Sequence, residues 1–272
     1  MIKKAYAKLN LFLNVKDKRE DGFHNLEMIN IMINLADELE FIPTDGEVKV
    51  VVMNNKSLNG KNNLAYKVAS YLKKAYRIET GVKILIYKNI PVGGGLGGGS
   101  SDAACALLAL NEFWNLGLSF DEMFELAKKF GSDTPYCLYQ EPAIVTGVGF
   151  DIKPIDIDIS NFDISLYNRG VNVSTGTIFK NLKSYNKYSL EDAIKALQSK
   201  DYNEFVKGLK NDLEDTVFEL YPEVKNQYDT VKRLCGEDGV FMTGSGSTII
   251  KISPKKIKMF SLWKRFLFYK SY

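Results

Sequence analysis

The chain has 272 residues, 45% of them hydrophobic and 25% charged, which is typical of a globular protein with room for one large or two modest cores. Its 36 basic and 33 acidic residues leave a net charge of +3, a balance that argues against a nucleic-acid-binding protein. The three cysteines are widely spaced, which favours neither disulfides nor a zinc site. The sequence shows no leader and no long apolar run, so a cytoplasmic protein that is neither exported nor membrane-spanning is expected.

The first fifty residues are predicted to form a β-rich layer. Residues 5–15 alternate partly in polarity and place Lys8 and Asn10 on one side, which indicates a strand that presents polar groups from one face. A turn at Asp21-Gly22 follows, and after it comes the only histidine, His24. The further strands expected in this layer lie at 28–35, 38–42 and 48–53.

The next hundred residues are predicted to be mainly helical around one central strand. Apolar residues at helical spacing indicate a helix over 63–72, with Asn62 or Asn63 as its N-cap. A β-branched run at 82–87 indicates a strand, and a glycine-rich stretch separates it from a helix at 102–115. Another helix is expected at 120–130.

The rest of the chain is predicted to alternate helices and strands, which suggests a second α+β domain from about residue 155. Its helices are expected at 190–197, within 202–220 and at 222–235, and strands at 143–150, 164–173, 239–243 and 249–252. Domains are therefore expected at 1–153 and 154–272. The basic run 251–270 is expected to be a solvated helix face with Trp263, Phe266 and Phe268 packed inward.

The stretch from Pro91 to Ala104 carries the strongest functional signal. Six of the chain's 21 glycines occupy seven consecutive positions there, between the predicted strand and the predicted helix. Glycine permits positive φ and close approach of backbone N–H groups to a ligand. The following helix aims unpaired N–H groups and the positive end of its dipole at the loop. Together these features predict a phosphate-binding loop.

Two widespread phosphate-binding motifs fit this stretch poorly. The GxGxxG spacing is satisfied from Gly93 onward, but a dinucleotide fold needs a second strand ending in an acidic residue about twenty positions later, where residues 119–127 indicate a helix start. A Walker A loop needs a lysine after its last glycine, whereas Gly99 is followed by Ser100. The remaining alternative is a flexible linker, and the flanking strand and helix disfavour it.

Four sequence blocks, in order along the chain, resemble one known superfamily. The blocks are Ala7–Leu11, Pro91–Ala104, Gly131–Pro135 and Thr243–Ser247. In them the chain resembles the galactokinase, homoserine kinase, mevalonate kinase and phosphomevalonate kinase (GHMP) superfamily. Residues 7–15 and 19–26 further resemble its branch that phosphorylates a cytidine-diphosphate-linked polyol in the non-mevalonate isoprenoid pathway. The resemblance covers nearly the whole chain.

The resemblance implies a two-domain α+β fold with the active site in the interdomain cleft. Residues 1–153 would form the ATP-binding domain and residues 154–272 the substrate-side domain. The implied reaction transfers a phosphoryl group from ATP, with Mg²⁺, to the 2-hydroxyl of the polyol, giving the 2-phosphate and ADP. Such chemistry depends on positioning and charge stabilisation, which N–H donors, a helix terminus and a cation supply.

The resemblance also assigns the reacting centre. Asp133 would act as general base toward the acceptor hydroxyl, and Lys8 beside it would keep that carboxylate ionised. Asn10, two residues along the same strand, would help to hold the substrate or Asp133. The residues alone leave two alternatives, a cap or turn role for Asp133 before Thr134 and an exposed strand position for Lys8.

The cytosine end of the substrate is placed by the same resemblance. It would lie between Phe23 and Phe179, with His24 making the polar contacts that identify the base. Phe23 departs from the tyrosine that the family often has, and Asn168-Arg169 replace its common proline and glycine, which changes the second wall. A structural role for His24 is the alternative.

A second glycine cluster is expected to close the substrate side of the cleft. Gly244 and Ser245 would approach the substrate there, because glycines let the backbone come close to a ligand. The alternative for this cluster is a simple hairpin or strand connection.

The nucleotide is placed over the first glycine loop. The resemblance puts adenine near Asn63 and Lys88. Ser101 is a candidate for contact with phosphate and with Mg²⁺, whose ligands are left unassigned. Asp102 is expected as a plain N-cap. The residues expected to bind ATP are Asn63, Lys88, Pro91, Gly93, Gly94, Gly95, Gly97, Gly98, Gly99, Ser100 and Ser101.

Three rival functions remain at this stage. The first is another kinase of the superfamily. It is disfavoured by the Asp21–His24 block, which has no role if no cytosine is bound. A catalytically silent nucleotide-binding protein would need neither Lys8 nor Asp133. A nucleic-acid binder conflicts with the balanced charge. The expected partner is a small molecule alone, with no nucleic acid and no membrane, and the expected assembly is a monomer or a weak homodimer.

Overall fold

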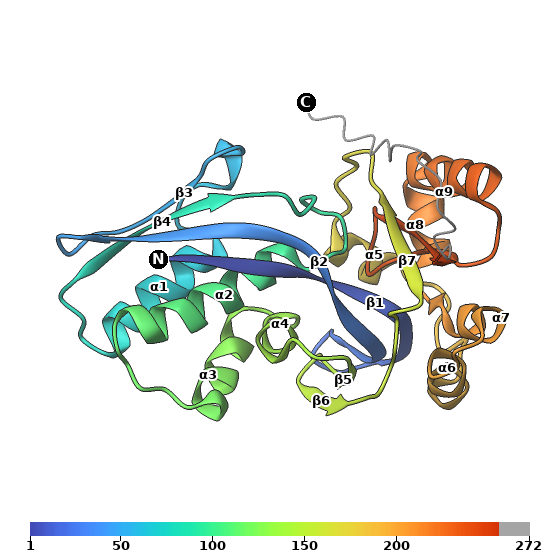
Figure 1. The fold of residues 1–272 in the computed structure, drawn as a ribbon, viewed down its shortest axis with the longest axis horizontal. Helices are drawn as coiled ribbons and strands as arrows, with labels where there is room; N and C mark the ends of the chain where they lie inside the picture. The colour runs from blue at the N-terminus through green and yellow to red at the C-terminus, as the bar shows by residue number, and fades with distance from the viewer. Residues whose placement is uncertain (256–272) are drawn as a thin grey trace, which may run out of the picture.

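The structure is a computed structural model that describes residues 1–255 (Figure 1). In it a seven-stranded sheet has the order β3-β4-β2-β1-β8, extended by β5 on β2 and β6 on β5. A three-stranded sheet has the order β7-β10-β9. The strands of the larger sheet are β1 (Ile2–Lys18), β2 (His24–Thr44), β3 (Val48–Val52), β4 (Gly81–Tyr87), β5 (Ala143–Gly147), β6 (Asp151–Pro154) and β8 (Lys210–Asn211). Those of the smaller sheet are β7 (Phe162–Tyr167), β9 (Val240–Met242) and β10 (Ile249–Pro254).

The helices of the two halves of the chain gather at opposite ends of the long strands β1 and β2, as Figure 1 shows. At one end lie α1 (Leu64–Ala75), α2 (Gly98–Phe113), α3 (Phe120–Ala127) and α4 (Thr134–Tyr139). At the other lie α5 (Thr175–Asn181), α6 (Leu190–Leu197), α7 (Tyr202–Phe205), α8 (Glu214–Leu220) and α9 (Pro222–Cys235). Short 3₁₀ turns occur at Lys56–Leu58, Lys128–Phe130 and Val206–Gly208. Through residue 255, no helix has both the length and the apolar character needed to cross a bilayer.

Strand β1 is the element shared by both ends of the molecule. Every residue from Ala7 to Val15 is buried. The strand pairs with β2 and β8 at its edges, and helices α2 and α6 also contact it. One core packs sheet residues such as Phe41 against α1 and α2. A second core joins Phe12 of β1 to Phe205 of α7. The division after residue 153 stays a prediction, since β8 of the later half extends the first sheet.

Most predicted elements are confirmed. The strand expected at 164–173 is shorter, since β7 covers only Phe162–Tyr167. The strands expected at 28–35 and 38–42 are one strand, β2, which shifts register against β1 between the Tyr6–Ala36 and Ala7–Ile33 pairs. The helix expected within 202–220 is interrupted, because Lys210–Asn211 pair in parallel with β1. The expectation for residues 251–270 concerns a segment that mostly lies outside the described residues.

The helix that follows the first glycine-rich stretch, expected at 102–115, begins earlier than predicted. Helix α2 starts at Gly98, and its N-cap is Gly97, which adopts the left-handed conformation at φ 67°. Asp102 is therefore not the N-cap. Its side chain is buried within the helix's second turn, where it meets a cation from outside the helix.

Asp37, Lys88 and Asp102 form a buried ionic cluster that joins β2, the end of β4 and α2. The Lys88 ammonium pairs with Asp37 and lies 2.8 Å from the Asp102 carboxylate. Asp37 also accepts the N–H groups of Asn89, at 2.5 Å, and Ile90, at 2.8 Å. Burial raises the pKa of Asp102 to about 7, against the pull of Lys88. The cluster thus anchors the glycine loop at both of its ends.

Replacing Asp37 should destabilise the fold more than any change at the neighbouring surface. Asp37→Ala leaves the N–H groups of Asn89 and buried Ile90 without an acceptor and Lys88 with one carboxylate, so we expect the free energy of unfolding to fall by roughly 3 kcal/mol. Urea denaturation measures this. The matched control is Glu38→Ala, an exposed neighbour on β2, which should change it by less than about 0.5 kcal/mol. Equal effects of the two substitutions would contradict the anchoring role.

Candidate active site

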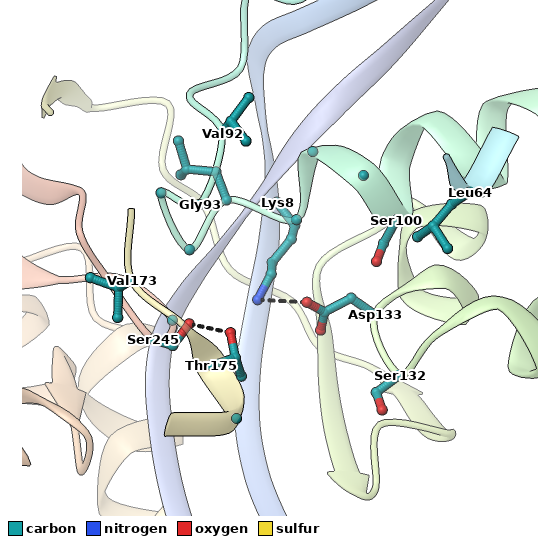
Figure 2. Close-up of a pocket in the computed structure, with 18 of the residues that line it drawn as sticks. Lys8, Leu64, Val92, Gly93, Ser100, Ser132, Asp133, Val173, Thr175 and Ser245 are labelled. Atoms are coloured by element: carbon teal, nitrogen blue, oxygen red, sulfur yellow. Dashed lines mark hydrogen bonds and ion pairs between the residues drawn. The ribbon is translucent and has the colours of Figure 1, made fainter. Parts of the chain in front are cut away.

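A cavity of about 900 Å³ lies where both glycine clusters, β1 and α5 meet. Figure 2 shows Lys8, Gly93, Asp133 and Ser245 converging on this space from different elements. Nearly all of the residues predicted for catalysis and binding line it. They are Lys8, Phe23, His24, Asn63, Lys88, Pro91, Gly93, Gly94, Gly95, Gly97, Gly98, Gly99, Ser100, Asp133, Phe179, Gly244 and Ser245. The two predicted residues absent from this lining are Asn10 and Ser101.

The first glycine loop leads into a helix N-terminus at the cavity. Gly93, Gly95 and Gly97 all have positive φ, a conformation that other residues rarely adopt. Helix α2 then starts at Gly98, so its first N–H groups lack helical acceptors and lie at the edge of the cavity. The geometry therefore suits an anion such as phosphate.

Lys8 and Asp133 form an ion pair at the floor of the cavity. The Lys8 ammonium lies 3.3 Å from the Asp133 carboxylate, and their side chains are 5% and 34% exposed. The dashed line in Figure 2 marks this pair. Asp133 occupies the N-cap position of α4 but makes no capping hydrogen bond, so its carboxylate is available to the cavity. A Cβ on Gly97 would lie 2.7 Å from Lys8 Cγ, which explains a glycine at that position.

Asn10 acts on Lys8 instead of on the cavity. Its side-chain oxygen accepts from the Lys8 ammonium at 2.7 Å, and its amide nitrogen donates to Asn30 at 2.6 Å. The residue is 2% exposed and does not line the cavity. We therefore correct its expected contact with the substrate or Asp133 to a role in orienting Lys8.

Ser101 also points away from the cavity. Its hydroxyl donates to the backbone carbonyl of Tyr6 at 2.5 Å, and the residue is 2% exposed. This hydrogen bond ties α2 to β1, so the expected contact of the Ser101 side chain with phosphate or Mg²⁺ is corrected. The hydroxyl of Ser100, one residue earlier, faces the cavity in its place (Figure 2).

The two glycine clusters pack backbone against backbone. A Cβ on Gly95 would lie 2.4 Å from the Thr243 carbonyl, and one on Gly244 would lie 2.6 Å from the Gly95 carbonyl. The N–H of Thr248 donates to the Gly94 carbonyl at 3.2 Å. The second cluster is therefore held against the phosphate loop and is not a free hairpin connection.

Two residues that sequence reasoning missed help to place the second cluster. Thr175, at the start of α5, shares a hydrogen bond of 2.7 Å with the Ser245 hydroxyl across the cavity (Figure 2). Asn211 is buried and donates to the carbonyls of Met242, at 2.7 Å, and Gly244, at 2.8 Å. Neither lies in a recognisable motif. Only the parallel pairing of β8 with β1 brings Asn211 to this position.

An aromatic group forms the far wall of the cavity. The His24 ring stacks on Phe179 with centroids 5.0 Å apart, and Tyr185 meets it edge-on at 6.3 Å. Phe23 is 60% exposed beside them. Burial, with the charge of Lys18, lowers the pKa of His24, which favours the neutral imidazole. The His24 side chain is among those that line the cavity.

This arrangement suits phosphoryl transfer to a hydroxyl group. An N–H-rich loop for phosphate, a buried cation and an accessible carboxylate meet in one cavity, and the aromatic wall offers a surface for a flat ring. The part of the chain that the structure describes contains no group of three or more His, Cys, Asp or Glu residues that could hold a metal by itself.

Comparison with known proteins agrees with this chemistry. The family model described as GHMP kinases N terminal domain matches residues 63–141, and that described as GHMP kinases C terminal matches residues 193–258. The chain is 41% identical to a 4-diphosphocytidyl-2-C-methyl-D-erythritol kinase of Geobacillus sp., covering 92% of this chain and 86% of that protein. It is 42% identical to the kinase of the same name from Shouchella clausii, covering 94% and 86%.

Solved structures extend the comparison to the fold. A crystal structure of 4-(cytidine 5'-diphospho)-2C-methyl-D-erythritol kinase matches with a TM-score of 0.75 and 33% identity, covering 92% of this chain and 89% of that one. Mevalonate kinase of Methanococcus jannaschii matches with a TM-score of 0.67 at 18% identity, covering 93% and 90%, a likeness of fold alone. The two-domain α+β kinase fold expected from the sequence is thereby confirmed, and the chain belongs to the GHMP kinases and, within them, to the 4-diphosphocytidyl-2-C-methyl-D-erythritol kinase family.

Proposed function

We propose that this protein transfers the γ-phosphoryl group of ATP to the 2-hydroxyl of 4-diphosphocytidyl-2-C-methyl-D-erythritol, giving the 2-phosphate and ADP in the non-mevalonate isoprenoid pathway. The observation that carries the proposal is the Lys8–Asp133 pair, 3.3 Å apart, in the same cavity as a phosphate-type loop and an aromatic wall. The kinase relatives that are 41% and 42% identical to this chain support it.

Asp133 and Lys8 divide the work at the reacting centre. The Asp133 carboxylate orients the acceptor hydroxyl and accepts its proton, which strengthens the oxygen as a nucleophile. The Lys8 ammonium favours the ionised carboxylate and steadies negative charge on the phosphoryl group in transfer. Asn10 fixes Lys8 through the 2.7 Å hydrogen bond, so the cation is placed before substrate binds. Backbone N–H groups of Gly93–Ser100 hold the phosphates.

The donor set fits a magnesium ion that is carried mainly by the nucleotide. Mg²⁺ in kinases is bound through phosphates, waters and one or two protein oxygens. Asp133 and Ser100 both line the cavity and would supply protein oxygens to such an ion. When bound, the ion neutralises charge on the β- and γ-phosphates.

The far wall suits the cytosine ring. Phe23 and Phe179 offer two aromatic faces, and the neutral His24 imidazole offers one donor and one acceptor to the edge of the base. Asn63 and Lys88 line the opposite part of the cavity, where we place adenine.

We propose that the enzyme acts in the cytoplasm on this small molecule alone, as a monomer or weak homodimer without nucleic acid. The cysteines Cys105, Cys137 and Cys235 are all free thiols in the described structure, which suits a reducing compartment.

The proposed activity predicts selective release of ADP. With Mg-ATP and a panel of acceptors, we expect turnover with 4-diphosphocytidyl-2-C-methyl-D-erythritol and none above background with mevalonate, homoserine or galactose. A coupled assay for ADP measures it. Turnover with one of the other acceptors would keep the kinase chemistry and remove the cytosine pocket, and no turnover by folded protein would favour a silent nucleotide-binding protein.

Asp133→Asn should abolish most turnover without unfolding the protein. The amide cannot accept the proton, so kcat is expected to fall by about 10²–10⁴-fold while KM for ATP changes little. Steady-state kinetics measure it, with Asp121→Asn on the exposed face of α3 as the matched control. A variant that keeps full kcat would remove Asp133 as the base.

Phe179→Ala should weaken binding of the cytidine acceptor selectively. Because stacking on one aromatic face contributes about 1–3 kcal/mol, KM for the acceptor is expected to rise roughly tenfold or more, with kcat and KM for ATP nearly unchanged. His24→Ala should act in the same direction. The control is Phe120→Ala, a 45% exposed phenylalanine on α3. Unchanged acceptor KM in the double variant of Phe179 and His24 would place the base elsewhere.

A further inference from the structure

Asp212 is a fully buried carboxylate that no catalytic role explains. It follows β8 directly, and its backbone N–H donates to the Leu13 carbonyl of β1 at 2.9 Å. It does not line the cavity. Burial raises its pKa, while hydrogen bonds from Val15 and Asn186 and the charge of Lys187 oppose that rise. A carboxylate that is buried in this way is unfavourable unless hydrogen bonds compensate for the loss of water.

The Asp212 carboxylate joins two segments that are far apart in the sequence. Its Oδ2 accepts the N–H of Val15, on β1, at 2.8 Å and the N–H of Asn186 at 3.0 Å. Its Oδ1 is buried and has no hydrogen-bond partner among residues 1–255. One oxygen therefore bridges the central strand and the connection between α5 and α6.

The connection held by Asp212 has a defined shape. Asn186 adopts a left-handed conformation, with φ 62°, which asparagine tolerates better than most residues. Asn14 of β1 provides a second tie, since its side chain donates to Asn186 at 3.3 Å and accepts from the Tyr188 N–H at 3.4 Å. The connection is thus fastened to β1 by side chains instead of by strand pairing.

This connection carries a tyrosine that packs against the aromatic wall. Tyr185 immediately precedes Asn186 and meets the His24 ring edge-on, at 6.3 Å. Helix α5, which leads into the connection, carries Phe179 against the face of the same ring. His24 itself pairs with Lys18, on the same strand as Val15. The position of Asp212 therefore bears on how two aromatic side chains meet a third, His24, at the start of β2.

We propose that Asp212 is a positioning residue for the cytosine pocket: by holding Val15 and Asn186 on one oxygen, it sets Tyr185 and Phe179 against His24. The proposal rests on the proposed function, because it takes the ring between these side chains to be the base of the acceptor. Tyr185 does not itself line the cavity, and in this proposal its edge contact supports the His24 ring from outside the lining.

The first test separates the two substrates kinetically. Asp212→Ala leaves two backbone N–H groups without their acceptor, and we expect KM for the cytidine acceptor to rise about tenfold while KM for ATP stays within about twofold. Asp212→Asn keeps one oxygen that can accept both N–H groups, so it should restore most of the loss. The control is Asp229→Asn, an exposed surface aspartate on α9.

A second variant tests the same idea without touching the buried carboxylate. Tyr185 is 40% exposed, so Tyr185→Leu should fold normally. It should raise KM for the acceptor, and adding it to Asp212→Ala should raise that KM by less than the product of the two separate effects, since both act on one wall. Independent, multiplying effects would contradict a shared role.

The single histidine provides a readout that does not depend on turnover. His24 is the only histidine, so in untagged protein its imidazole C–H signals in the NMR spectrum are unambiguous. Because the ring lies against Phe179 and Tyr185, Asp212→Ala should move these signals, and Asp212→Asn should move them less. Unmoved signals, or equal rises in KM for both substrates, would overturn the proposal. Failure of the proposed function is distinct, since the unaltered enzyme would then fail to phosphorylate the cytidine acceptor.

Discussion

The structure depends on a lysine that is buried beside a carboxylate where two glycine clusters meet. Lys8 is placed by Asn10, and the Lys8 N–H donates to the Leu96 carbonyl of the first glycine loop at 3.1 Å. A buried cation is unfavourable unless paired, so the Asp133 carboxylate and the Asn10 oxygen must both be present. This requirement explains why β1 is buried along both faces, since the strand must bring Lys8 to a point that elements from both halves of the chain enclose.

Family membership and local chemistry describe the same cavity from different directions. The relatives establish the kinase family, whereas the close packing of Gly95 on Thr243 explains why the signature blocks lie so far apart in sequence and so close in space. The first glycine loop is anchored by Asp37 and Lys88, whereas Asn211 holds the second glycine cluster and Asp212 the connection after α5. Separate sets of buried polar residues thus fix the loops on the two sides of the cavity.

Local patterns predicted what is locally determined. The glycine loop, α6 and α9 could be read from the sequence because glycine density, capping serine and proline act within a few residues. The interruption before α8 could not, because it follows from pairing of Lys210–Asn211 with a strand two hundred residues earlier. The predicted phosphate contact of Ser101 is wrong for a similar reason. Only its tertiary hydrogen bond to Tyr6 decides which of two adjacent serines faces the cavity. The role of Asp102 likewise depends on a tertiary contact, its ion pair with Lys88, which local sequence does not reveal.

The hydrogen bond between the Asn10 N–H and Thr243 Oγ1 spans 233 positions of the chain. Contacts of such separation form late, because a long loop must close before they contribute. The first glycine loop and α2 come far earlier in the chain than Thr243, so they are synthesised first. The cavity is complete only after the second glycine cluster has packed against the first.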